Sequence, residues 1–217
     1  MGKRKIEYQN NLVWISEQLE KFERVNYEEW KKLTQGAVAD LAPVTVLTKG
    51  KKEILDIRVS DWYSLTTYYH MGLHQRTLFA FIWETLSIAM DCERAGLRIE
   101  KLSWSWDLIF VDNRTRRVKM LYWPVTDLNP AGNDVLEFYR GFIQVMSAIG
   151  MDQKVITAYA EYFQHREFFD INLFRQNVQQ IMEQWRLQRH EIQKQVEDRQ
   201  RDKDLSRRIK ADRKSVV

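Results

Sequence analysis

The sequence predicts a single domain of the α+β class, in which a small β-rich N-terminal part is followed by a helical body with a β-hairpin insert. Strand-like alternation of apolar and polar residues occurs within residues 11–59, and apolar residues recur at helical spacing from residue 78 onward. A second strand-like pair interrupts the helical pattern between residues 108 and 123. The chain has 217 residues, 44% of them hydrophobic, which is enough for one core. We expect this domain to span residues 8–185, followed by a basic tail, helical or disordered, over 186–217.

The N-terminal part is expected to begin with a strand and a short helix. Residues 11–15 form a short apolar run with β-branched and aromatic side chains, which favour strands. A helix is expected over residues 27–35, because Asn26 has a side chain suited to capping its start and Gly36 follows its end.

A β-hairpin is predicted next, with strands at residues 44–48 and 54–59. Alternation in the second strand predicts that Leu55, Ile57 and Val59 face the core, and that Asp56 and Arg58 face away from it. Three lysines in the turn are expected to point into solvent, because a turn between short strands points outward. They are Lys49, Lys51 and Lys52.

The helical body is predicted to begin with a long central helix that ends near Gly96. Its apolar residues share one stripe, formed by Leu78, Phe81, Ile82, Leu86 and Ala89. The inserted hairpin then has expected strands at residues 108–111 and 118–123. Further helices are expected over residues 135–146, over residues 155–163 and after Asp170, which has the side chain of a helix cap.

Charge and cysteine content restrict the functional classes. Lys and Arg number 34 against 30 Asp and Glu, a net charge of +4. Residues 186–217 hold 11 basic and 6 acidic side chains, a net +5, so the rest of the chain carries only −1. Specific nucleic-acid recognition is therefore not expected. The single Cys92, and the lack of a long apolar run after residues 1–5, favour a cytoplasmic protein without a transmembrane segment.

The sequence carries no recognisable motif for catalysis or for a cofactor. No two of the 8 Gly lie within eight residues of each other, so a Gly-rich loop for phosphate groups is missing. Neither the pair His70 and His74 nor Cys92 has the spacing of a four-ligand zinc site. We therefore assign no catalytic, cofactor-binding or metal-binding residue, and we expect that the protein is not an enzyme.

The order of the predicted elements resembles that of the protein kinase fold. Residues 107–112 resemble the kinase segment that begins with the metal-binding Asn, and residues 118–121 resemble the strand that leads into the Asp-Phe-Gly motif. The resemblance places the position of the catalytic Asp near Leu102, within residues 100–102, and residues 122–124, Tyr-Trp-Pro, at the position of Asp-Phe-Gly. Asp107 is then the only carboxylate near a metal position. The resemblance thus implies a kinase-like fold that lacks the catalytic chemistry.

Four segments carry a closer resemblance: residues 27–30, 53–57, 107–123 and 158–174. They are similar to the kinase-like N-terminal domain, of unknown function, of Firmicutes proteins that contain a forkhead-associated (FHA) domain. That domain is in turn similar to the pseudokinase domain of the type VII secretion membrane subunit. The resemblance covers residues 8–185, and no FHA domain follows within these 217 residues. It implies a pseudokinase that binds a protein partner in a signalling or membrane secretion complex.

Trp104 and Trp106 are the candidate protein-binding residues. They flank Ser105 in the loop before the inserted hairpin. Side chains at positions i and i+2 of an extended loop point the same way, and we expect an exposed pair that docks a partner.

The sequence therefore predicts a catalytically inactive, minimal kinase-like module for protein interaction. Two alternatives stay open. One is an active phosphotransferase or nucleotide-binding protein with a non-standard site around Asp107 and Asp112. The other is a nucleic-acid-binding protein that uses its basic tail, whose affinity would fall steeply with salt.

Overall fold

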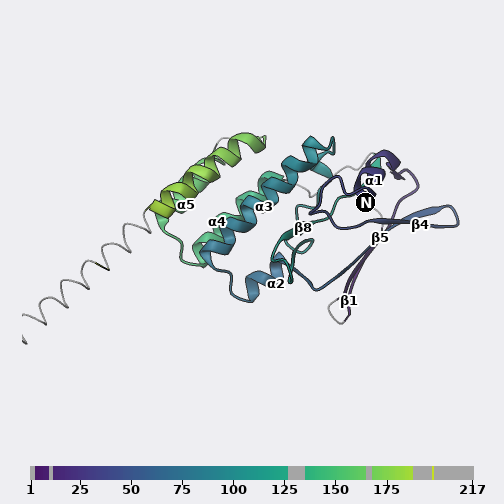
Figure 1. The fold of residues 1–217 in the computed structure, drawn as a ribbon, viewed down its shortest axis with the longest axis horizontal. Coiled ribbons are helices and arrows are strands. Elements are labelled where there is room, and N and C mark those ends of the chain that lie inside the picture. Colours follow the sequence, from purple (N-terminus) through teal and green to yellow (C-terminus); the bar gives the residue numbers. More distant parts are fainter. Residues whose placement is uncertain (1–2, 10–11, 127–134, 165–167, 188–196, 198–217) are drawn as a thin grey trace, which may run out of the picture.

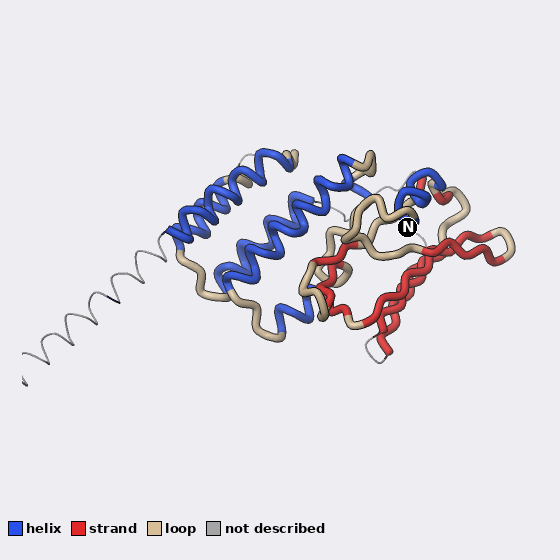
Figure 2. The backbone as a smooth tube through the Cα atoms, in the orientation of Figure 1, coloured by secondary structure: helices blue, strands red, loops and turns tan. Residues whose placement is uncertain are grey.

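The structure is a computed structural model that describes residues 3–9, 12–126, 135–164, 168–187 and 197. Strands gather in one half of the elongated molecule and helices fill the other half (Figures 1 and 2). This mixture of small antiparallel sheets and helices confirms the predicted α+β class. The tail over residues 188–217 lies outside the described residues, apart from Glu197.

The β-rich half is built on a four-stranded antiparallel sheet. Its strands are β1 (Lys3–Gln9), β2 (Leu12–Gln18), β4 (Thr45–Lys49) and β5 (Lys52–Ser60). They lie in the order β1-β2-β5-β4. The predicted strand and hairpin are confirmed as β2 and as the pair β4 and β5. The first strand, β1, begins ahead of the expected domain start at residue 8.

The inner face of this sheet has the expected apolar side chains, and one polar residue on its outer face is also buried. Leu55, Ile57 and Val59 are buried as predicted. Asp56 faces away from the core, as predicted, but it is only 6% exposed. Its carboxylate accepts hydrogen bonds from the Trp14 indole and, at 2.9 Å, from the Arg58 guanidinium. These partners on the outer face cover Asp56 and satisfy its charge.

The expected short helix is present as α1 (Tyr27–Thr34). The Asn26 side chain accepts a hydrogen bond from the N–H of Glu29, so this residue is the cap that the sequence predicts. Gly36, just past the helix, has a φ of 70°, a conformation that favours glycine. Before α1, β3 (Arg24–Val25) pairs with β9 (Val125–Thr126).

The middle of the molecule holds the predicted long helix and the inserted hairpin. The long helix is α3 (Gln75–Arg94), preceded by α2 (Leu65–His70) and followed by the short 3-10 helix η1 (Ile99–Lys101). All five residues of the predicted stripe of α3 are buried. The hairpin strands β7 (Ile109–Asp112) and β8 (Val118–Met120) form a sheet with β6 (Trp62–Ser64).

The C-terminal helices lie on the side of α3 that faces away from the sheets (Figure 1). They are α4 (Val135–Ala148), α5 (Gln153–Glu161) and a last helix over residues 171–187. The Asp170 side chain accepts a hydrogen bond from the N–H of Leu173 and so caps that last helix, as predicted. Among the described residues, none of these helices is long and apolar enough for a membrane crossing.

Candidate functional site

The candidate site is the junction between the sheet of β1, β2, β5 and β4 and the loop segments on either side of the inserted hairpin. Apolar residues of the sheet and of the hairpin segments belong to one core cluster. The sheet contributes Val13, Ile15, Leu55, Ile57 and Val59, and the hairpin segments contribute Leu108, Phe110, Leu121, Trp123 and Val125. The two parts are therefore in direct apolar contact at this junction.

The positions that the kinase resemblance assigns to catalysis lie inside the protein. Leu102, near the position of the catalytic Asp, and Tyr122, at the position of the metal-binding Asp, are each 0% exposed. Their backbones form an isolated antiparallel bridge. The Tyr122 hydroxyl accepts a hydrogen bond from the N–H of Arg98. Burial, and then the nearby charge of Glu29, raise the pKa of Tyr122 above its ordinary value.

Trp123 fills the junction at the end of this segment. It is 1% exposed, and its indole N–H lies 3.4 Å from the Ser103 hydroxyl. The Arg4 guanidinium of β1 stacks 4.5 Å from the centre of a Trp123 ring. The same guanidinium forms an ion pair with Glu17 of β2 at 2.6 Å. A strand that the sequence analysis missed thus supplies a cation that covers this tryptophan.

Glu17 is an acidic side chain on the inner face of the sheet. It is 3% exposed. Desolvation raises the pKa of its carboxyl, although the charge and hydrogen bond of Arg4 act in the opposite direction. The carboxylate therefore depends on Arg4 for its main compensation.

A second buried ion pair joins α1 to η1. The Lys101 ammonium lies 2.8 Å from each carboxylate oxygen of Glu29. The two side chains are 6% and 11% exposed. A neighbouring contact on the same helix joins the Lys32 ammonium to the carbonyl of Gly96 at 3.0 Å. Two lysine contacts thus tie α1 to the segment that follows α3.

Asp107 and Asp112, the centre of the alternative catalytic hypothesis, have different surroundings. Asp107 is exposed. The pKa of Tyr8 in β1 is raised mainly by burial and secondly by the nearby negative charge of Asp107. Asp112 lies in the turn of the hairpin, where its carboxylate accepts hydrogen bonds from the N–H groups of Arg114 and Thr115. Despite slight desolvation, these bonds lower its pKa. The carboxylate of Asp112 therefore shapes the turn.

The expectation of an exposed tryptophan pair is wrong for Trp104. This side chain is 4% exposed, and its indole N–H donates to the carbonyl of Ile99 at 2.9 Å. The Trp106 ring is partly buried and lies 4.7 Å from that of Phe142. Both rings also contact Phe138 of α4, because the aromatic face of that helix covers the loop. The two tryptophan side chains do point the same way, but toward the core.

The remaining candidate metal ligands do not form a cluster among the described residues. Cys92 is fully buried, and burial raises the pKa of its thiol to about 12. No group of three or more His, Cys, Asp or Glu side chains is placed to hold a metal ion within the part of the chain that the structure describes. His165 lies outside the described residues.

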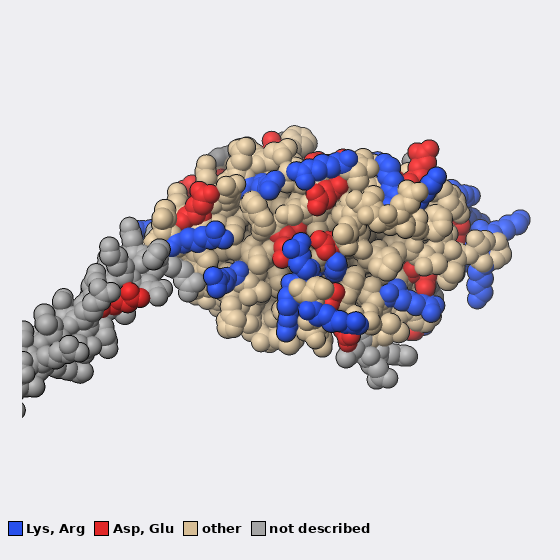
Figure 3. All heavy atoms as spheres, viewed as in Figure 1, with Lys and Arg blue, Asp and Glu red and all other residues tan. Residues whose placement is uncertain are grey.

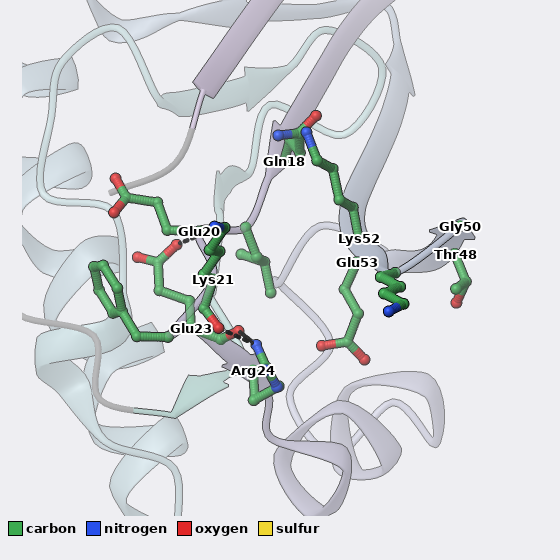
Figure 4. A pocket seen from close by; sticks show the side chains of 12 residues that line it. Gln18, Glu20, Lys21, Glu23, Arg24, Thr48, Gly50, Lys52 and Glu53 are labelled. Carbon is green, nitrogen blue, oxygen red and sulfur yellow. Dashed lines mark hydrogen bonds between the residues drawn. The ribbon is translucent and has the colours of Figure 1, made fainter.

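An open groove of about 990 Å³ lies at the far end of the β-rich half. One wall is residues 18–24, between β2 and β3, and the other is the tip of the β4 and β5 hairpin (Figure 4). The groove includes Lys51 and Lys52, which the sequence analysis identified only as solvent-facing turn residues. Both are exposed, as expected.

No family model matches this sequence, and no curated protein matches it. Among solved structures, two of WbdD, described in one case as a bifunctional kinase-methyltransferase, are similar to it at 12% identity, with TM-scores of 0.47 and 0.46. The alignments cover 83% of this chain and 43% and 42% of the WbdD chains, so this chain spans less than half of their length. Both similarities are to one protein.

Proposed function

We propose that this chain is a catalytically inactive kinase-like domain that binds a protein partner in bacterial signalling or secretion, in the cytoplasm. The observation that carries the proposal is the packed junction between the sheet and the hairpin segments. In protein kinases, a Gly-rich loop covers the nucleotide phosphates, while an Asp and an Asn on the other side hold the magnesium ions. In this chain, apolar side chains fill the junction between the sheet and the hairpin segments, which supports the absence of a nucleotide site.

Trp123 and Arg4 lie together at this junction. The stack of guanidinium and indole is joined to Glu17 through the ion pair of Arg4. A ligand site normally needs about 300 Å³ or more of open volume, which a nucleotide could gain here only by displacing these groups. Displacing Arg4 would also leave the carboxylate of Glu17 buried and unpaired, which is unfavourable.

The missing carboxylates support the same proposal. Phosphoryl transfer requires a group that orients the nucleophile and groups that hold magnesium. Leu102 and Tyr122 cannot fill these roles as the catalytic and metal-binding Asp do, and both are buried. Asp107 keeps an exposed carboxylate but lacks those two partners.

Thermal denaturation with ATP and magnesium tests the inactive state. A ligand present at about 100 times its Kd stabilises a protein by about 2.7 kcal/mol, which corresponds to a rise in Tm of about 5 to 10 °C for a chain of this size. We expect a change of less than about 1 °C at millimolar ATP. Transfer of labelled phosphate by the parent chain, lost in Asp107→Ala, would establish the phosphotransferase alternative instead.

A further inference from the structure

The groove between residues 18–24 and the hairpin tip has a distinctive distribution of charge. Its lining includes four basic side chains and three acidic ones. The basic ones are Lys21, Arg24, Lys51 and Lys52, and the acidic ones are Glu20, Glu23 and Glu53. The net formal charge is only +1, so the engagement of each group decides what the groove presents.

Two of the carboxylates are engaged within the protein. Glu53 accepts hydrogen bonds from the N–H of Val25 at 3.0 Å and from the Tyr27 hydroxyl at 2.7 Å, one on each oxygen. Glu23 is 4% exposed and accepts from the N–H of Glu20 at 2.8 Å. Both carboxylates are thus held by neighbouring groups of the groove walls, and Figure 4 draws the hydrogen bond between Glu23 and Glu20. The carboxylate oxygens of both residues accept hydrogen bonds from the protein itself rather than from a ligand.

The three lysine ammonium groups are in the opposite situation. Lys21, Lys51 and Lys52 are exposed, and none of their side chains forms an ion pair or a hydrogen bond with another residue that the structure describes. Lys21 belongs to one wall, and Lys51 and Lys52 belong to the other. Basic side chains also project at the end of the surface where Figure 1 places this hairpin (Figure 3). Unpaired cations therefore flank the groove from both sides.

The groove also has an apolar component. Phe22, one of its lining residues, is 66% exposed, and the buried Leu19 also lines the groove. A large exposed aromatic side chain is typical of the anchors that protein interfaces bury. The aliphatic stems of the lysines extend such a surface, because lysine can cover apolar groups while its ammonium stays in water.

We propose that this groove binds an acidic segment of a partner protein, with carboxylates on the three lysines and an apolar side chain against Phe22. The inference rests on the proposed function, since it assigns a place and a chemistry to the protein partner. Charge complementarity selects an acidic occupant, and the exposed aromatic ring selects a peptide over a purely ionic ligand.

Fluorescence polarisation with a labelled acidic peptide of repeated Glu-Glu-Leu units tests this site. Removing three exposed charge contacts with Lys21→Ala/Lys51→Ala/Lys52→Ala should weaken binding about tenfold. Phe22→Ala should weaken it about fivefold, and raising the salt from about 50 to 500 mM should weaken binding to the parent chain. All four side chains are exposed, so the variants are expected to fold.

Matched controls come from exposed residues on other elements. The triple change Lys31→Ala/Arg76→Ala/Lys154→Ala removes the same charge from α1, α3 and α5. Phe168→Ala removes another exposed phenylalanine, which is 83% exposed. We expect both controls to bind the peptide within about twofold of the parent chain.

Three outcomes would overturn the proposal. One is no binding by the parent chain up to about 1 mM peptide. Another is equal weakening in the groove and control triples. The third is that inorganic polyphosphate or anionic lipid vesicles bind as tightly as the peptide and Phe22→Ala has no effect, which would indicate a general anion-binding surface. None of these outcomes bears on ATP binding or phosphate transfer, so the tests of catalytic inactivity remain separate.

Discussion

Replacing Lys101 by Met should destabilise the protein by about 3 to 5 kcal/mol, because it leaves the Glu29 carboxylate buried without its counter-ion. The magnitude follows from the geometry of the pair. The ammonium lies 2.8 Å from both carboxylate oxygens, and the lysine side chain is 6% exposed. Water therefore has little access to the Glu29 carboxylate and cannot replace the lost ammonium group. Exposed ion pairs, by contrast, contribute only about 0 to 1 kcal/mol.

Thermal and urea denaturation of Lys101→Met would measure the loss, with an expected fall in Tm of about 6 to 20 °C. The double variant Lys101→Met/Glu29→Met should recover most of it, because an apolar pair of similar volume often matches a buried ion pair. Arg94→Met is the control. It breaks the exposed pair with Asp91, whose side chains are 68% and 52% exposed, and should cost less than about 0.5 kcal/mol.

A loss of less than about 1 kcal/mol in Lys101→Met would show that the Glu29 carboxylate does not depend on this lysine. A second contradictory result would be that the losses of stability in Lys101→Met and in Glu29→Met, measured separately, simply add in the double variant. Additivity would mean that the two side chains do not interact, since coupled neighbours give a non-zero interaction energy in such a cycle.

Three further predictions concern the core and the junction. Phe81→Ala should cost about 3 to 5 kcal/mol in denaturant unfolding, because the side chain is 4% exposed in the central helix, and a loss below about 1 kcal/mol would contradict its place in the core. Trp104→Ala should cost a similar amount for the same reason, and a folded variant with unchanged Tm would show that the ring is dispensable. Glu17 has a raised folded-state pKa, so its contribution to stability increases as the pH falls through that pKa toward 4.5 and is lost as the pH rises. The Tm of the parent chain relative to Glu17→Gln should therefore rise on acidification between pH 7 and 4.5, and a constant difference would show that the Glu17 carboxyl does not titrate differently in the folded state.

Local patterns were sufficient to predict most of the secondary structure. The turn at residues 49–52, the cap at Asn26 and the glycine at position 36 each depend on neighbours within a few residues, and each is present in the structure. The stripe of α3 was also predictable, because helical spacing alone determines which side chains share a face.

Features that depend on distant residues were not predictable from local pattern. The strand β1 was missed because its start is strongly charged, and its pairing depends on β2 and on the contact between Arg4 and Trp123. Trp104 was expected to be exposed because nothing in its own loop indicates that the aromatic face of α4 covers it. The pair of Glu29 and Lys101 joins residues 72 positions apart, and only the folded arrangement of α1 and η1 brings them together.

The core cluster shared by the first sheet and the hairpin segments also affects how the chain folds during synthesis. The strands β1, β2, β4 and β5 are complete once residue 60 has been made, but their inner face is covered by residues as far along as Val125. At about 5 to 20 residues per second, the ribosome needs about 3 to 13 s to add the intervening 65 residues, from 61 to 125. During that interval the nascent sheet leaves Ile15, Leu55 and Ile57 exposed to solvent. This part of the chain is therefore expected to need chaperone protection until the hairpin emerges.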